Sequence, residues 1–251
     1  MAAQTINRYP ITIEGEITLI GTASELAVAL DVLQGQYDHE ALTQLRPHLA
    51  EIVANASGLM TVMRSLSHAD QIFLFQSLGS DLVQVMQSAR HLRDMLATMA
   101  DHQVEEALLT TLGSAGLRRL IATGRELAEV LEWVYGEQDE LALSLFGPDT
   151  LRRLCRNAGD LSAVLHTLDF NLQSRFLDQL GWEYVLSLVD DGRDLAYLLR
   201  SLPPANSAEL LHHFTGKQLK DLIGHAAEWE YLYQRLEPAE ARLLLDKLAL
   251  S

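Results

Sequence analysis

A residue period close to 34 is the feature that most constrains what this chain can fold into. A Leu or Phe followed by Gly recurs at 34-residue intervals, at Leu78-Gly79, Leu112-Gly113, Phe146-Gly147 and Leu180-Gly181. The next copy begins at Gly216, one residue later than the period predicts. A fixed period of roughly 20–50 residues is typical of repeat architectures, in which each unit buries its apolar face against its neighbours.

Apolar residues recur at fixed positions within each copy. In the copy that starts at Gly147 they are Leu151, Leu154, Leu161, Leu165 and Leu168. Spacings of three and four place such residues on one face of a helix, so each copy is predicted to hold three short helices. In this copy we expect helices over about 149–157, 160–168 and 172–180. Helices of about nine residues are too short to be stable alone, so they must pack on one another.

The copies define the expected domain organisation. Residues 1–22 are predicted to be an N-terminal tail and β-like cap, and 23–251 a helical repeat domain. The domain is divided into a partial repeat 23–45 and the repeats 46–78, 79–112, 113–146, 147–180, 181–215 and 216–248. The fold class that follows is all-α, a right-handed superhelical solenoid of 33–34-residue three-helix repeats, similar to armadillo and HEAT arrays.

The passage from residue 10 to residue 21 is the one strand-like segment of the chain. Ile11 and Ile13 alternate with polar residues, as do Ile17 and Leu19, and Glu14-Gly15 lies between the two pairs. This pattern predicts either a small hairpin or one extended arm. An isolated two-stranded hairpin is marginal in water, so the segment must lie on the first helices or pair with another chain. Self-association is therefore expected through this segment, or through the leucine-rich C-terminal helix.

Charge, cysteine content and the lengths of the apolar runs exclude several classes of protein. A formal net charge of −15 opposes general affinity for the phosphate backbone of nucleic acids. The single cysteine, Cys155, excludes an internal disulfide. No apolar run approaches the roughly 20 residues that a membrane helix needs, and no secretory signal is visible. We therefore expect a cytoplasmic protein without a membrane span, with a protein partner of unidentified kind.

Two resemblances accompany this pattern. The stretch Leu165-His166-Thr167-Leu168-Asp169, followed after a break by Arg175-Phe176-Leu177-Asp178-Gln179-Leu180, resembles the α-helical superhelix of the cytosolic domains of magnesium channels and of flagellar motor switch proteins. That resemblance implies a cytosolic regulatory or docking role.

The period is also similar to that of transcription activator-like effectors. Phe146-Gly147-Pro148-Asp149-Thr150-Leu151, with Asn157-Ala158-Gly159 further along, resembles their first helix and base-reading loop. Other copies carry Ala122-Thr123-Gly124 or Asp190-Asp191-Gly192 at the loop, and the chain is acidic. A DNA-reading role is therefore not inferred.

Arginines recur at equivalent positions of successive copies and form the main candidate binding site. Arg118 and Arg119 hold the same two positions as Arg152 and Arg153, and Arg156 lies close by. Stacked in a solenoid, these side chains would form a ladder that binds an acidic peptide or phosphate groups through forked hydrogen bonds. The alternative is that they pair with acidic residues of the array, namely Glu126, Glu129, Asp149 and Asp160.

The remaining candidates are few. Trp182 follows the Gly of its copy and is a candidate exposed anchor for a partner, whereas Trp133 and Trp229 fall on apolar stripes and are predicted to be core residues. Cys155 stands at an apolar position and is predicted to be buried. No Cys/His or carboxylate cluster has metal-ligand spacing, and no catalytic constellation or cofactor loop is present. The sequence favours a non-enzymatic protein-interaction scaffold, with anionic-ligand or nucleic-acid binding through the arginines as the alternative.

Overall fold

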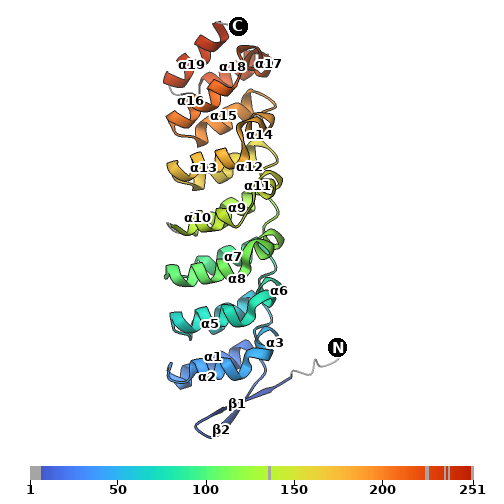
Figure 1. The fold of residues 1–251 in the computed structure, drawn as a ribbon, viewed down its shortest axis with the longest axis vertical. Helices are drawn as coiled ribbons and strands as arrows, with labels where there is room; N and C mark the ends of the chain where they lie inside the picture. The colour runs from blue at the N-terminus through green and yellow to red at the C-terminus, as the bar shows by residue number, and fades with distance from the viewer. Residues whose placement is uncertain (1–6, 135–136, 224–225, 235, 237, 250–251) are drawn as a thin grey trace. The chain divides into compact units, whose positions relative to one another are not determined.

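The computed structural model describes residues 7–134, 137–223, 226–234, 236 and 238–249. Within those ranges the chain is mainly α-helical, with one short antiparallel sheet near the N-terminus, so the all-α class is confirmed (Figure 1). The chain divides into two compact units. Unit 1 is Met1–Ile121 with Trp133–Leu141, and unit 2 is Ala122–Glu132 with Ala142–Ser251. The first six residues of the expected tail lie outside the described residues.

Unit 1 begins with a β-hairpin, which confirms the hairpin alternative of the sequence analysis. β1 (Tyr9–Ile13) pairs with β2 (Glu16–Ile20), and Ile13 lies opposite Glu16. The two turn residues between them, Glu14 and Gly15, have positive φ angles of 52° and 85°. Two successive positive φ angles are typical of a type I′ turn, whose twist matches that of the strands it joins.

The helices of unit 1 follow in the order that the sequence predicts. They are α1 (Ala23–Leu33), α2 (Asp38–Leu45), α3 (Leu49–Val53), α4 (Ala56–Met63), α5 (His68–Leu78), α6 (Leu82–Met86), α7 (Ala89–Leu96) and α8 (His102–Leu120), with short 3₁₀ turns at η1 (Arg46–His48) and η2 (Gly79–Asp81). α1 packs on α4 and α4 on α7, while α2 packs on α5 and α5 on α8. β1 rests against α2, which anchors the hairpin to the first helices.

Unit 2 contains the copy from which the helices were predicted. Its helices are α9 (Gly124–Leu131), α11 (Pro148–Leu154), α12 (Ala158–Thr167), α13 (Phe170–Leu180), α14 (Trp182–Ser187), α15 (Gly192–Ser201), α16 (Pro204–His213), α17 (Gly216–Leu222), α18 (Ala226–Tyr233) and α19 (Pro238–Ala249), and α10 (Glu137–Ser144) spans residues of both units. α12 packs on α9 and on α15, and α15 packs on α18. α11, α12 and α13 coincide closely with the three predicted helices.

Two of the recurring glycines, Gly113 and Gly181, have a structural reason, whereas Gly147 has an ordinary φ of −77°. α8 bends at Gly113, where φ is 56°, and α13 ends at Gly181, where φ is 80°. Positive φ is reached without steric cost only by glycine, so these residues end one helix and allow the chain to turn into the next.

Side-chain caps recur before the middle helix of the partial repeat and of the five copies up to residue 215. In each case a side-chain oxygen accepts a hydrogen bond from the backbone N–H three residues later, at Thr22, Asn55, Ser88, Thr123, Asn157 and Asp191. Such a cap satisfies one of the free N–H groups at a helix start. Gly124 and Gly192 lie in the first turn of their helices, because the capping residue sets the boundary.

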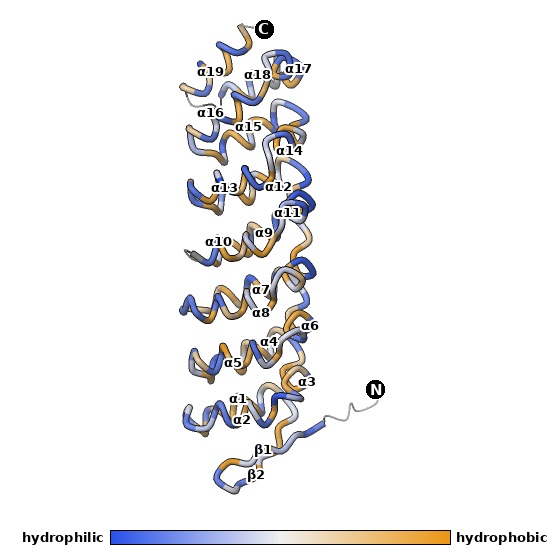
Figure 2. Tube along the Cα trace, viewed as in Figure 1, coloured by the Kyte–Doolittle hydropathy of each residue, from blue (hydrophilic) through white to orange (hydrophobic). Residues whose placement is uncertain are grey.

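Each helix contributes one apolar face to the core of its unit. Figure 2 shows hydrophobic and hydrophilic residues alternating along the helices, as expected for elements with one buried face. Leu165, at a position that is Leu in three successive copies, is fully buried. Within the described ranges no helix is both long and apolar enough to cross a membrane.

Candidate functional site

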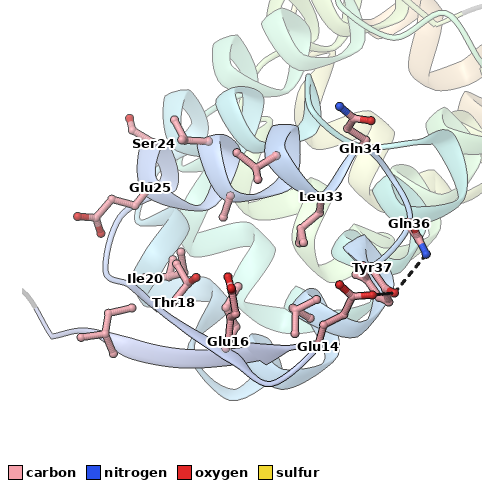
Figure 3. A pocket seen from close by; sticks show the side chains of 16 residues that line it. Glu14, Glu16, Thr18, Ile20, Ser24, Glu25, Leu33, Gln34, Gln36 and Tyr37 are labelled. Carbon is pink, nitrogen blue, oxygen red and sulfur yellow. Dashed lines mark hydrogen bonds between the residues drawn. The ribbon is translucent and has the colours of Figure 1, made fainter.

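Unit 1 contains an open cavity of about 930 Å³ between the hairpin and α1. Its lining comes from β1, β2, α1 and the segment that leads to Tyr37 (Figure 3). Ligand pockets commonly have volumes of about 300–1,000 Å³, so the cavity is large enough for side chains of a partner. We refer to it as the N-terminal groove.

The groove has an apolar floor and apolar rims. Ile11, Ile13 and Ile20 are buried on the sheet face that looks toward α1. The side chains of the rims are exposed, unlike those of the floor. Leu19 on β2 is 51% exposed, and Val28 and Val32 on α1 are 63% and 76% exposed. These three are among the eight large hydrophobic side chains that are exposed in the described part of the chain, and a fourth, Ile17, lies on β2 outside the lining of the groove. Such a concentration of exposed apolar surface is typical of an interaction site.

The groove is bordered by acidic groups. Glu14 and Glu16 stand at the turn of the hairpin, and Glu25 stands on α1. Glu14 accepts a hydrogen bond from the Tyr37 hydroxyl, and this bond raises the pKa of Tyr37. Glu25 is tied to the fold, since it accepts from the Gly21 N–H at 2.8 Å and pairs with Arg8 at 2.7 Å.

Glu16 is the acid left available at the groove, as it has no hydrogen-bond or ion-pair partner among the described residues. The surrounding sequence strengthens this charge, because residues 1–45 contain six acidic residues and a single basic one, Arg8. A groove of this sign attracts a cationic partner.

The outer edge of β1 is closed to further pairing. Pro10 has no N–H to offer. The Thr12 N–H donates to Gln44 Oε1 at 2.8 Å, and Gln44 Nε2 donates to the Thr12 carbonyl at 2.9 Å. A free strand edge is a template for pairing with another chain, and here it is occupied by a side chain of α2.

The outer edge of β2 is open. Residues that flank a two-residue turn exchange both hydrogen bonds, and bonded pairs then alternate with non-bonded pairs along the hairpin. From the Ile13–Glu16 pair, the register places Ile17 and Leu19 at non-bonded positions, so their N–H and C=O groups point away from β1. Within the described chain no group from outside the hairpin bonds them. The two edges of this sheet are therefore unequal.

The structure places the predicted arginines in both units. Arg118 and Arg119 are exposed at the end of α8 in unit 1, whereas Arg152, Arg153 and Arg156 belong to unit 2. Arg118 Nε donates to the Ser114 carbonyl of its own helix, and Arg156 Nε donates to the Arg153 carbonyl. Arg119 and Arg153 have no partner for their guanidinium groups among the described residues.

Two of the carboxylates considered as partners for these arginines have other roles. Glu126 accepts from the Ala122 N–H at 2.7 Å, and Asp160 accepts from Asn157 Nδ2 at 2.9 Å. Both lie in the first turn of a helix, where a negative charge is stabilised by the helix dipole. In the described ranges none of the five arginines forms an ion pair.

Arg152 differs from the other arginines because its guanidinium group is bound within unit 2. Its Nε and Nη2 donate to the Leu180 carbonyl at 2.9 and 2.7 Å, where α13 ends. The same group lies 5.5 Å from the centre of the Tyr184 ring, whose hydroxyl donates to the Arg152 carbonyl at 2.6 Å. Arg152 thus links α11 to the end of α13 and to α14.

Trp182 is half-buried and not an open anchor. Its ring stacks on His213, with centroids 4.7 Å apart, so it joins α14 to the end of α16. Trp133 and Trp229 are also half-buried, less enclosed than core residues. Cys155 is buried as predicted, and burial raises the pKa of its thiol to about 12, which leaves the nucleophilic thiolate unpopulated at neutral pH.

The N-terminal groove was not predicted from the sequence, although the sequence contains a signal for it. Leu26 and Leu30 form the buried stripe of α1, and Val28 and Val32 form a second apolar stripe that the repeat pattern does not require.

Among the described residues, no group of three His, Cys, Asp or Glu could hold a metal ion. Comparisons with protein-family models, with curated proteins and with solved structures find no match, so the site rests on its own geometry.

Proposed function

We propose that this protein is a non-enzymatic interaction scaffold that binds a segment of a partner protein in the N-terminal groove. The observation that carries the proposal is the clustering of Leu19, Val28 and Val32, all exposed, in the lining of one open cavity. Leaving this much apolar surface in water is unfavourable by roughly 25 cal/mol per Å², and a partner that covers it recovers that free energy. We place this activity in the cytoplasm.

We also propose that the helices continue as a right-handed superhelical solenoid of three-helix repeats. The support is the 33–35-residue spacing of the six capping residues and the packing of successive middle helices within each unit. Small-angle X-ray scattering tests this directly. An elongated particle is expected, and a compact globule would contradict the proposal.

The experiment for the scaffold function is affinity capture from the native host with matched variants. The double substitution Val28→Asp and Val32→Asp places charge on the apolar rim and should abolish retention of the partner. Phe170→Asp is the control, because Phe170 is 50% exposed but lies in unit 2. Partners retained equally by all three proteins would exclude the groove as the binding site.

A second candidate function is the binding of an anionic ligand or nucleic acid through the arginines. Arg119 and Arg153 favour it, because both are exposed and have no partner among the described residues. Exposed charge attraction is screened over about 8 Å at physiological ionic strength, so such binding should weaken as salt rises. Titration of single-stranded DNA and of an acidic peptide against the Arg119→Glu, Arg153→Glu double variant tests it. Unchanged binding in this variant would argue against the candidate.

A further inference from the structure

We infer that the open edge of β2 binds an extended, basic segment of a partner protein as a third strand of the sheet. The inference rests on the proposed function and specifies its binding mode and the chemistry of the partner. Strand addition to an exposed edge is a recurrent mode of peptide recognition, in which backbone hydrogen bonds supply affinity and alternate side chains supply specificity.

The backbone groups for such a strand are already in place. The N–H and C=O groups of Ile17 and Leu19 point outward, and residues on an adjacent strand can pair with both. β1 cannot compete for the partner, since Pro10 and Gln44 close its outer edge. A partner strand therefore has one edge available and joins the sheet on the β2 side.

The position of α1 determines which side chains the added strand needs. β1 lies against α2 and β2 lies against α1, so a strand beyond β2 continues the sheet along α1. Figure 3 shows Glu16, Thr18 and Ile20 on the side of β2 that faces this helix. Side chains alternate across a strand, so every second residue of the partner would enter the groove toward Val28 and Val32. The residues that lie beside Val28 and Val32 should be apolar.

The acidic residues at the turn of the hairpin determine where the partner strand needs basic side chains. Glu14 and Glu16 stand at the turn end of the edge, and Glu16 has no partner among the described residues. A lysine or arginine in the partner would pair with Glu16 across the strands, where opposite charges contribute roughly 0.2–1 kcal/mol. A second copy of this chain would bring the same two acids to the interface, so charge favours a basic partner over self-association.

Two substitutions at one position separate backbone pairing from side-chain packing. Leu19→Pro removes the outward N–H and leaves the bonds to β1 intact, because Leu19 is at a non-bonded position opposite Pro10. Leu19→Thr keeps the N–H but removes the apolar side chain. The probe is a short synthetic peptide of alternating valine and threonine with lysines at both ends, and its control carries glutamates in place of the lysines.

Binding is measured by isothermal titration calorimetry, and amide hydrogen exchange is followed by NMR on the full chain. We expect the lysine peptide to bind and the glutamate peptide not to bind. Leu19→Pro should weaken binding by about tenfold, as expected for one lost backbone hydrogen bond, and Leu19→Thr should weaken it less. The amides of Ile17 and Leu19 should exchange more slowly in the complex. An unchanged spectrum outside the hairpin shows that the variants are folded, and Ile17→Pro serves as a second edge variant if Leu19→Pro is not.

Several outcomes would overturn the inference. Equal binding to the wild type and to both proline variants, or helical circular dichroism of the bound peptide, excludes strand addition. Concentration-dependent dimerisation abolished by Leu19→Pro would make a second copy the occupant. If the host partner is lost in the Val28→Asp, Val32→Asp variant but kept in Leu19→Pro, the scaffold function stands and strand addition fails. If neither variant loses the partner, the groove is not the site.

Discussion

Pro10 lies directly opposite Leu19 in the N-terminal hairpin, and this pair makes the two edges of the sheet unequal. The proline removes one donor from the β1 edge, while the leucine presents its N–H on the β2 edge. Natural sheets protect exposed edges with prolines, charges or covering side chains, because an open edge invites pairing with another chain. In this hairpin the β1 edge is protected and the β2 edge is not, so pairing with another chain is blocked on one side only.

Gln44→Leu should reopen the β1 edge. The substitution removes both hydrogen bonds between the side chain and Thr12, so the exchange of the Thr12 amide should accelerate and the free energy of unfolding should fall by about 1–2 kcal/mol. Hydrogen exchange and urea denaturation measure the two effects. Gln44→Glu is the control, because it keeps the acceptor for the Thr12 N–H and loses only the donor. Unaltered exchange at Thr12 in the leucine variant would show that the edge is protected by another group.

Asp38→Asn should stabilise the protein at neutral pH. Asp38 is only 1% exposed, and its pKa is raised first by burial and then by the nearby charge of Asp70. A carboxyl whose pKa is raised in the fold binds its proton more tightly than in the unfolded chain. Stability therefore falls as pH rises from the ordinary aspartate pKa through the raised value. We expect a gain of about 1 kcal/mol at neutral pH, where the wild type carries a buried charge.

The measurement for Asp38→Asn is a set of urea denaturation curves across the acidic to neutral range. The difference between wild type and variant should be largest at neutral pH and should shrink as the pH falls. Asp81→Asn is the matched control, since Asp81 is exposed. A variant that is destabilised at neutral pH would mean that the carboxylate of Asp38 is favourably paired.

Leu165→Ala should lower the free energy of unfolding by about 2–5 kcal/mol, because a fully buried leucine is replaced by a cavity. Chemical denaturation measures the loss. Leu245→Ala serves as the comparison, since Leu245 is 45% exposed and its truncation should change stability by less than about 0.5 kcal/mol. A loss below about 1 kcal/mol at Leu165 would contradict the assignment of the buried face of α12.

Arg152→Lys should destabilise unit 2, whereas Arg153→Ala should not. A lysine cannot reproduce the two bonds from Nε and Nη2 to the Leu180 carbonyl or the position of the planar group over Tyr184. We expect a loss of about 1–2 kcal/mol for Arg152→Lys in thermal or urea denaturation. Equal stability of the two variants would show that the Arg152 contacts contribute no net free energy.

Local patterns in the sequence predicted much of the fold. The alternation of Ile11 and Ile13 around Glu14-Gly15 predicted the strands, and the leucine spacing predicted α11, α12 and α13. These features depend on neighbours a few residues apart. The buried state of Leu165 and of Cys155 followed from the same periodicity.

The candidate site could not be predicted in the same way, because it depends on contacts between distant residues. The closure of β1 requires Gln44, which lies 32 residues from Thr12. The role of Arg152 depends on the Leu180 carbonyl, 28 residues away. Every residue type has a backbone carbonyl, so the residue type at position 180 does not predict this contact. Equivalent sequence positions also differ in their contacts, since Arg118 bonds to Ser114 while Arg152 bonds to Leu180.

Some recurring polar positions were missed because their chemistry varies between copies. Gln71 Nε2 donates to the carbonyls of Met63 and Leu66, which end the preceding middle helix. Gln173 makes the same bonds to Leu165 and Leu168. Ser207 replaces the amide with a hydroxyl in the next copy. A search for the same residue type at each period misses such a position, because what recurs there is a side-chain hydrogen-bond donor.

The caps from Thr22 to Asp191 have a consequence for how the chain tolerates changes in length. Each cap accepts a hydrogen bond from the amide three residues further along the chain, so the starts of these six middle helices are encoded locally. The intervals between successive caps vary from 33 to 35 residues without loss of any cap. A one-residue insertion in a connecting turn is thereby corrected at the next cap, and errors in phase do not accumulate. Local capping of this kind is compatible with the duplication or deletion of a whole repeat, because the helices of the neighbouring repeats keep their own start signals.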